Sequence, residues 1–161
     1  MNTNEQIIEE FYSAFANHNY QTMASCYHPE AIFKDPAFGT LQGKDISDMW
    51  QMLLERAKGN LSVEFSDIKA NATTGSAKWT AIYVFSKTKR KVKNKIRANF
   101  VFKDGLIFAH EDEFDFHTWA KQALGNIGFW LGWTTFLKKK VQHEAIESLR
   151  KFQQKKQLTD I

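Results

Sequence analysis

The spacing of the hydrophobic residues alternates between a helical period and a period of two along this chain, and this pattern constrains the fold more than any other feature of the sequence. Helical spacing predicts helices over residues 4–17, 20–27, 44–58, 117–124 and 134–155. Two-residue spacing predicts strands over residues 30–35, 61–70, 76–86, 92–103 and 106–116. Helices that precede a run of adjacent strands are typical of an α+β protein with an antiparallel sheet.

The length and composition favour one globular domain. The chain has 161 residues, 43% of them hydrophobic and 14% aromatic, which is enough for a sizeable core. Its one cysteine, Cys26, excludes an internal disulfide and fits a reducing compartment. The N-terminal stretch MNTNEQIIEE is polar, and no apolar run approaches the roughly 20 residues of a membrane span. We therefore expect a cytoplasmic protein.

The positive charge is concentrated at the C-terminus. Residues 138–161 contain seven Lys or Arg against three Asp or Glu, which accounts for the whole net charge of +4. A second basic stretch, residues 87–97, lies in the strand region, and three of its side chains are expected to face acidic partners. Because little unpaired positive charge remains on the domain, we do not expect nucleic acid as a partner.

Two hairpin registers are possible at the turn Lys103-Asp104-Gly105, and burial decides between them. A two-residue loop would scatter apolar and charged side chains over both faces of the sheet. A three-residue loop, with Gly105 in the left-handed conformation as a bulge, separates them. It places Lys93, Lys95 and Arg97 opposite Asp115, Glu113 and Glu111 on the outer face. Because a one-residue slip exchanges the two faces, we adopt the three-residue loop.

His110 and Asp112 are the strongly polar residues on the resulting inner face, within the stretch FAHEDEFDF (residues 108–116). A carboxylate is costly to bury without a partner, and an adjacent imidazole can share its proton. The pair is a candidate for acid–base chemistry in a lipophilic pocket, and a structural His–Asp hydrogen bond is the alternative. We expect the pocket wall and the substrate contacts to come from Trp50, Trp79, Tyr83, Phe100, Phe102, Phe108 and Phe114.

Two stretches carry a resemblance to a known family. The opening FYSAFANHNYQTMASCYHPEAIFKDPAFG and the hairpin FVFKDGLI are similar to the SnoaL-like and ketosteroid-isomerase-like branch of the nuclear transport factor 2 superfamily, over about residues 4–118. The resemblance implies a cone-shaped α+β barrel, in which a curved antiparallel sheet wraps around N-terminal helices. It implies a SnoaL-like domain at residues 1–118 and a C-terminal helical extension at 119–161 packed on the same domain.

The resemblance also implies roles for individual residues. Tyr12 falls where ketosteroid isomerases keep the tyrosine that donates to the developing enolate, and Asp35 falls where they keep the proton-shuttling carboxylate. Ala98 replaces their second oxyanion donor, a protonated aspartate. His110 and Asp112 resemble the Arg-x-Asp pair of limonene-epoxide-hydrolase-like members, with histidine in place of arginine. They are closest to the inward His/Asp set of SnoaL-type polyketide cyclases. Alternatively, Tyr12 is a buried core tyrosine and Asp35 forms an Asx turn at Pro36.

These observations predict a small-molecule pocket protein. We expect a cofactor-independent acid–base enzyme, an isomerase, cyclase or hydratase, that acts on a lipophilic substrate through Asp112, His110, Asp35 and Tyr12. No Cys/His cluster suggests a metal, and no cofactor is expected. A non-catalytic ligand-binding or protein-interaction module of the same fold is the alternative. We expect a homodimer formed through the outer face of the sheet.

The segment after the sheet combines a group of aromatic residues with lysines. Its apolar residues Phe129, Trp130, Leu131, Trp133, Phe136 and Leu137 precede Lys138–Lys140. We expect this segment to pack over the domain or across a dimer. A lid over the pocket mouth and a contact with an anionic membrane surface are the alternatives, and we do not expect the membrane contact.

Overall fold

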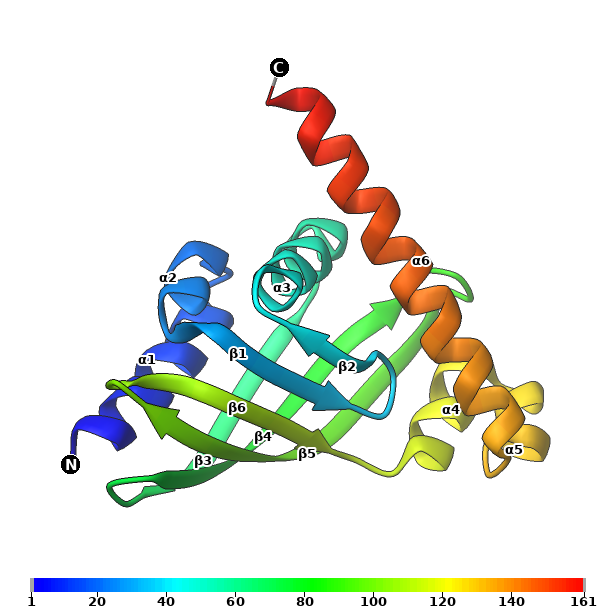
Figure 1. Ribbon diagram of the computed structural model, residues 1–161. Coiled ribbons are helices and arrows are strands. Elements are labelled where there is room, and N and C mark those ends of the chain that lie inside the picture. Colours follow the sequence, from blue (N-terminus) through cyan, green and yellow to red (C-terminus); the bar gives the residue numbers. More distant parts are fainter. Residues whose placement is uncertain (1, 161) are drawn as a thin grey trace.

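The structure is a computed structural model that describes residues 2–160. A strongly curved sheet wraps around the N-terminal helices, and further helices follow the last strand (Figure 1). The helices are α1 (Thr3–Ala16), α2 (Tyr20–Ser25), α3 (Lys44–Ala57), α4 (Phe116–Leu124), α5 (Asn126–Leu131) and α6 (Thr135–Thr159). The strands are β1 (Tyr27–Asp35), β2 (Gly39–Gln42), β3 (Ser62–Ala70), β4 (Thr74–Phe85), β5 (Arg90–Lys103) and β6 (Leu106–Glu113). The predicted α+β class is confirmed.

The sheet is mixed and open, whereas the sequence predicted an antiparallel barrel. Its strand order is β2-β1-β6-β5-β4-β3, so β2 and β3 form two free edges. β1 runs parallel to β6, and the other neighbours are antiparallel. Adjacent hairpin strands must be antiparallel because a short turn joins them. No such turn links β1 to β6, so the sequence pattern could not fix their relative direction.

The hairpin between β5 and β6 differs from the predicted register in the position of its bulge. Its loop contains two residues, Asp104 and Gly105, which both have positive φ angles of 54° and 75°. That conformation belongs to the tight turn that matches the twist of an antiparallel pair. The register shifts farther along, where Phe102 faces Ile107 and Val101 faces Ala109, so Phe108 is the inserted residue.

This change corrects the cross-strand pairing and preserves the assignment of the two faces. Arg97 lies opposite Glu113, and Lys93 and Lys95 extend beyond the end of β6, so the three predicted ion pairs do not form. The observed pairing differs from the predicted one by two residues. An even shift leaves every side chain on its face. His110 and Asp112 therefore point inward, as predicted.

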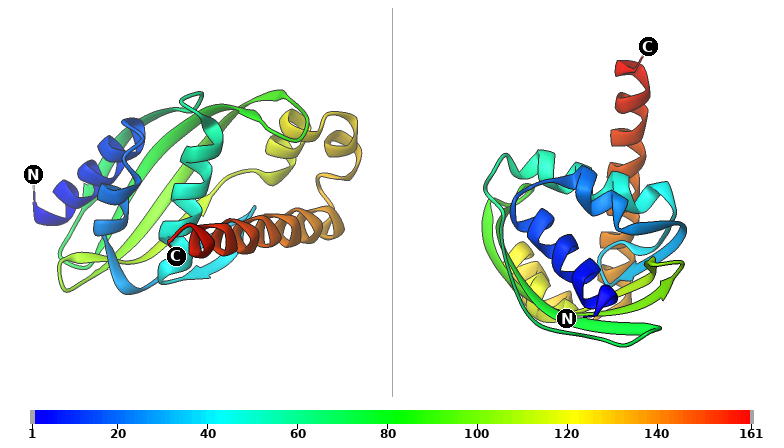
Figure 2. Two further views of the ribbon diagram at one scale, coloured as in Figure 1. Left: turned by 90° about the horizontal axis from the view of Figure 1, so that it is seen from above. Right: turned by 90° about the vertical axis from the view of Figure 1, so that its left-hand side faces the viewer.

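The core lies between the inner face of the sheet and the helices α1 and α3. Along β5, residues alternate strictly between buried and exposed from Val92 to Lys103. The helix α1 turns Ile8, Phe11, Tyr12 and Phe15 toward this face, and a capping box between Asn2 and Glu5 begins the helix. These contacts place α1 inside the curve of the sheet (Figure 2).

The C-terminal helices form a second, smaller core and then return along the domain. Asp115 caps α4, because its carboxylate accepts a hydrogen bond from the backbone N–H of Thr118. Phe116 and Trp119 pack with Val92 of β5 in this second core. The helix α6 then passes α3. Arg150 and Gln153 of α6 contact Asp45 of α3, and Lys156 contacts Asp48. Within residues 2–160, no helix combines the length and the apolar character needed to cross a membrane.

Candidate active site

The His110–Asp112 pair lies at the centre of the inner face. Nε2 of His110 is 2.9 Å from Oδ1 of Asp112. The two side chains are 0% and 3% exposed, respectively. Both project from β6 between β1 and β5, where neighbouring strands hold their backbone on either side. A buried pair of this kind needs further hydrogen bonds to offset the desolvation of its polar atoms.

Those further hydrogen bonds form a chain in which each group donates to the next, from Trp50 to Asp112. The indole N–H of Trp50 donates to the hydroxyl oxygen of Tyr27 at 3.1 Å. The Tyr27 hydroxyl lies 2.7 Å from Nδ1 of His110. Because an indole can only donate, the tyrosine hydrogen is free to point at Nδ1, which then accepts. The imidazole proton is thereby assigned to Nε2, which donates to Asp112. At the far end, the indole N–H of Trp79 donates to the same carboxylate oxygen at 3.3 Å.

Aromatic rings enclose the imidazole on all sides. Ring centroids lie between 4.5 Å (Phe100) and 6.4 Å (Trp50) from that of His110, and the five rings are Phe11, Tyr27, Phe33, Trp50 and Phe100. These side chains exclude water from the histidine, so the chain of hydrogen bonds operates in a medium of low polarity. Asp112 is buried as well, at 3% exposure, so surrounding side chains would have to shift before a ligand could reach the pair.

Tyr12 has a buried hydroxyl with no hydrogen-bond partner within the described residues. Burial raises the pKa of this phenol well above its ordinary value, and the negative charge of Asp112 raises it further. The group therefore stays protonated and keeps an unused donor near Asp112. An unsatisfied buried hydroxyl destabilises a fold, so this position is suited to a ligand oxygen.

Asp35 ends β1 and lies apart from the histidine. Its carboxylate accepts the backbone N–H groups of Ala37 and Phe38, which form the Asx turn around Pro36 that the sequence left open as an alternative. The residue as a whole is half-buried, but protein atoms densely surround its carboxyl group. This burial raises the pKa of Asp35 to about 7, although the two backbone hydrogen bonds oppose the shift. No hydrogen bond within residues 2–160 joins Asp35 to the central pair.

The raised pKa of Asp35 predicts a pH-dependent stability. Between its usual value of 3.8 and about 7, the native state binds more protons than the unfolded state, so this group's contribution to stability decreases as pH rises through that range. The variant Asp35→Asn lacks this titration and keeps the acceptor oxygen for the turn. We expect the stability of Asp35→Asn relative to the parent protein to increase from pH 5 to pH 8 by on the order of a few kcal/mol.

Urea unfolding at several pH values measures this difference. Glu9→Gln, which removes a carboxylate from the exposed face of α1, is the matched control and should show a small and nearly constant difference. A difference for Asp35→Asn that stays constant across the same pH range would contradict the prediction.

The structure places most of the predicted wall residues on the inner face. Trp50, Trp79, Phe100 and Phe102 are buried in the main core. Tyr83 and Phe114 are half-buried where the main core meets the second core, and the hydroxyl of Tyr83 accepts the indole N–H of Trp119 at 2.8 Å.

Phe108 is the exception, and its prediction as a wall residue is wrong. The bulge turns it away from the core, so that its ring packs against His28 and lies 5.0 Å from Nζ of Lys103. Ile107, fully buried, takes its inward position. The predicted bulge at Gly105 assigned the wrong faces to Phe108 and Ile107, because the real bulge comes three residues later.

Tyr27 belongs to the site, and sequence reasoning missed it. Helical spacing places Tyr27 at the end of the predicted helix over residues 20–27, and the predicted strand begins at residue 30. In the structure β1 begins at Tyr27, and its pairing with β6 shifts between Tyr27 and Ile32. An alternation pattern cannot show which way a residue before such an irregularity points. No group of three or more possible metal ligands occurs in the described part of the chain.

The curved sheet and the helix inside it define a class of protein, the nuclear transport factor 2-like α+β fold. The profile of the SnoaL-like domain matches residues 8–110, and the chain belongs to this family. The match includes His110 and ends before Asp112, and it leaves out the helices α4 to α6. Among curated proteins, no significant relative is found.

Several solved structures share the fold. The LEH-like epoxide hydrolase of M. tuberculosis is 20% identical, with a TM-score of 0.60 and coverage of 80% of this chain and 96% of that chain. IdmH from Streptomyces antibioticus, assigned as a polyketide cyclase, is 17% identical, with a TM-score of 0.60 and coverage of 73% and 95%. TerC, co-crystallised with polyporic acid, is 16% identical, with a TM-score of 0.60 and coverage of 71% and 92%. At these identities the similarity establishes the fold alone.

Proposed function

We propose that this protein is a cofactor-independent acid–base enzyme that acts on a small lipophilic molecule, as an isomerase, cyclase or hydratase. One observation carries the proposal. The buried donor chain from Trp50 through Tyr27 and His110 ends on Asp112, whose charge acts on the unpartnered hydroxyl of Tyr12. A proton carrier and a neutral hydrogen-bond donor in one apolar space are the components needed to move a proton and to stabilise the resulting oxyanion.

In this mechanism Asp112 exchanges the proton with the substrate. His110 and Trp79 both donate to its Oδ1, and no hydrogen bond within the described residues involves Oδ2, which can face the reacting carbon or oxygen. The imidazole orients the carboxylate, and Tyr27 fixes the tautomer that makes this possible. The Tyr12 hydroxyl donates to the substrate oxygen on which negative charge develops.

Asp35 fits the role of a second proton carrier. Its pKa of about 7 lets it take up and release a proton near neutral pH, which is the condition for efficient general acid–base catalysis. The charge of Asp112 contributes to this shift, so the two carboxyl groups interact electrostatically although no hydrogen bond joins them in the described residues. Asp35 is also half-buried, and it can pass a proton to solvent more easily than the enclosed pair can.

A non-catalytic module is the second candidate, and one observation favours it. The rings of Phe100 and Phe33 lie within 5.1 Å of the imidazole, centroid to centroid, so side chains occupy the space beside the pair. A substrate can enter only if part of this wall moves. A protein that binds a ligand or a partner elsewhere on its surface would not need that movement.

Exchange of carbon-bound hydrogen for deuterium separates the two candidates. NMR in heavy water would follow exchange next to the carbonyl in a panel of lipophilic ketones and lactones. We expect the parent protein to accelerate exchange for some members, and Asp112→Asn to lower that rate by at least about 100-fold with the fold intact by circular dichroism. Binding of a panel member with no exchange would support the non-catalytic module.

Tyr12→Phe completes the test, with Tyr83→Phe as its matched control. Removing the Tyr12 hydroxyl should slow exchange while leaving stability unchanged or higher, because this hydroxyl has no partner to lose. Removing the Tyr83 hydroxyl leaves the indole N–H of Trp119 without its acceptor, so it should cost stability, in contrast to Tyr12→Phe. Equal exchange rates for Asp112→Asn and the parent protein would overturn the proposed function.

A further inference from the structure

A cluster of large apolar side chains is exposed at one end of the molecule. Ten such side chains are more than 40% exposed in the described chain, and six of them fall within residues 127–136. These six, which we call the aromatic end, are Ile127, Phe129, Trp130, Leu131, Trp133 and Phe136. Trp130, Trp133 and Phe136 are about 70% exposed. Single exposed apolar residues are common on proteins, but a contiguous group of this size marks an interaction surface.

Close backbone packing fixes the outward orientation of these side chains. The helix α5 approaches α4 through its glycines: a Cβ on Gly128 would lie 1.8 Å from the carbonyl oxygen of Ala120, and one on Gly132 would lie 2.8 Å from the His117 ring. His117 also lies 3.0 Å, through Nε2, from the carbonyl oxygen of Phe129. Because the glycine side of α5 faces the protein, its large side chains face away from it.

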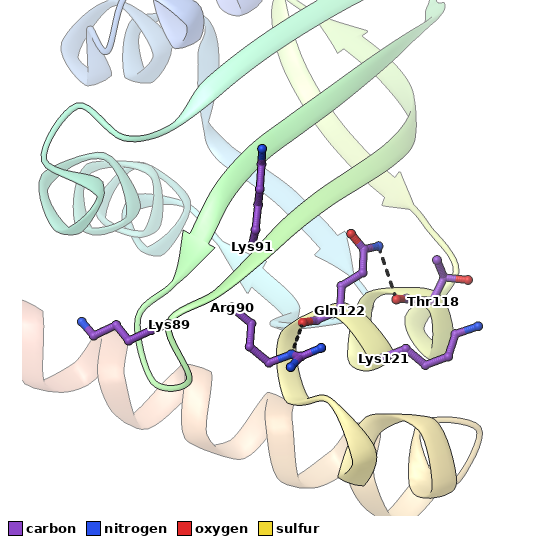
Figure 3. Close-up of a pocket in the computed structure, with 6 residues that line it drawn as sticks. All are labelled: Lys89, Arg90, Lys91, Thr118, Lys121 and Gln122. Atoms are coloured by element: carbon purple, nitrogen blue, oxygen red, sulfur yellow. Dashed lines mark hydrogen bonds between the residues drawn. The ribbon is translucent and has the colours of Figure 1, made fainter.

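The surroundings of the aromatic end are basic. From residue 116 to residue 143 the sequence contains no Asp or Glu, and Lys138–Lys140 follow directly after the last aromatic residues. A surface depression between the β4–β5 hairpin and α4 adds further positive charge at this end of the molecule (Figure 3). Its lining residues are Lys89, Arg90, Lys91, Thr118, Lys121 and Gln122. Arg90 donates to the carbonyl oxygen of Gln122 at 2.8 Å, which ties the hairpin to α4.

The shared sign of these charges decides between two occupants of the surface. A symmetric contact between two copies would place the same lysines of both chains near one another, and like charges oppose such a contact. A bilayer with acidic headgroups is complementary to both features. Tryptophan and phenylalanine favour the boundary between headgroups and acyl chains, and lysines gain from the negative surface potential.

We propose that the aromatic end docks on the surface of an anionic phospholipid bilayer. Trp130, Trp133 and Phe136 enter the headgroup boundary, and the exposed Lys139 and Lys140 lie over the lipid phosphates. This proposal departs from the expectation drawn from the sequence, in which the segment packs on the domain or on a second copy. The reason is the outward orientation of the three rings, which helical spacing alone did not reveal.

Co-sedimentation with lipid vesicles tests the proposal. The parent protein should bind vesicles made of equal parts of phosphatidylcholine and phosphatidylglycerol, should bind pure phosphatidylcholine far less, and should be released by salt. Replacing Lys139 and Lys140 together by glutamine should weaken binding by roughly 30-fold. Trp130→Ser combined with Trp133→Ser should weaken it by at least about tenfold and remove the blue shift of tryptophan fluorescence that accompanies binding.

Matched controls lie on the same helix. Lys151→Gln with Lys155→Gln, and separately Leu158→Ser, alter exposed residues of α6 far along the chain from the aromatic end, and they should leave binding unchanged. Three results would overturn the proposal. The parent protein could fail to bind the anionic vesicles, or the control variants could weaken binding as much as the others. The serine variants could also abolish self-association in analytical ultracentrifugation while vesicle binding persists, which would assign the surface to a second copy.

Discussion

Replacing His110 by phenylalanine should lower the free energy of unfolding by about 3–5 kcal/mol, as expected when one member of a buried ionisable pair is removed. The new ring is similar in size to the imidazole and suits the surrounding aromatic side chains, so the cost comes from lost hydrogen bonds and not from a cavity. Asp112 would keep one donor, Trp79, within the described residues, and Tyr27 would lose its acceptor. Urea unfolding monitored by circular dichroism measures the change.

A second substitution gives this prediction its control. Adding Asp112→Leu to His110→Phe removes the carboxylate that the first change leaves without its main partner. We expect the double variant to be more stable than His110→Phe alone, because an apolar replacement of both members of a buried pair costs less than the loss of one. Additive losses in the two variants would contradict this account of the site.

The same reasoning explains why this pair supports a functional assignment. If leucine and phenylalanine together can replace Asp112 and His110 at little cost, stability alone does not require polar groups at this position. The core would be stable without these two groups, yet Tyr27 and Trp79 hold them in a defined orientation. A role in a chemical reaction explains their presence better than a role in stability.

Replacing Gly128 by alanine should be the other large effect. The added Cβ would lie 1.8 Å from the carbonyl oxygen of Ala120 and 2.8 Å from the backbone nitrogen of Lys121. Backbone atoms cannot rotate away as a side chain can, so α5 must separate from α4. We expect a loss of about 3 kcal/mol, the upper end of the range for overpacking, or detachment of α5 with loss of its amide protection in hydrogen exchange.

Ile127→Ala is the matched control for this change. Ile127 is 60% exposed next to Gly128, and its truncation should alter stability by less than about 0.5 kcal/mol. Unchanged stability and unchanged amide protection in Gly128→Ala would show that the two helices are not packed as closely as described.

Most of the strands and their faces followed from the sequence because their pattern is strongly periodic, whereas the short strand β2 was not predicted. From Val92 to Lys103, apolar residues occupy alternate positions, with Asn94 and Val101 as the two exceptions, and burial allows only one of the two faces to point inward. The cross-strand pairing did not follow, because the inserted residue can lie either in the loop or farther along the strand. Beyond the insertion, both positions give the same assignment of side chains to the two faces. Phe108, which lies at the bulge itself, and Ile107 beside it received the wrong faces.

Contacts between distant parts of the chain were beyond the reach of a periodic pattern. The inward direction of His110 and Asp112 could be predicted, but their partner Tyr27 lies 83 residues before His110. The short helix α5 was also missed, because its six residues include a glycine and are too few to show a helical period. The unpartnered hydroxyl of Tyr12 could be identified only from the packing around it.

The parallel pairing of β1 with β6 determines when the site can assemble during folding. Tyr27 enters the chain of hydrogen bonds from one strand and His110 from the other, and these strands meet only after the intervening hairpins have been built. Contacts with so large a loop between them form late, since closing the loop costs entropy that local contacts do not incur. A nascent chain therefore lacks the hydrogen bonds around His110 until nearly all of its sheet is in place.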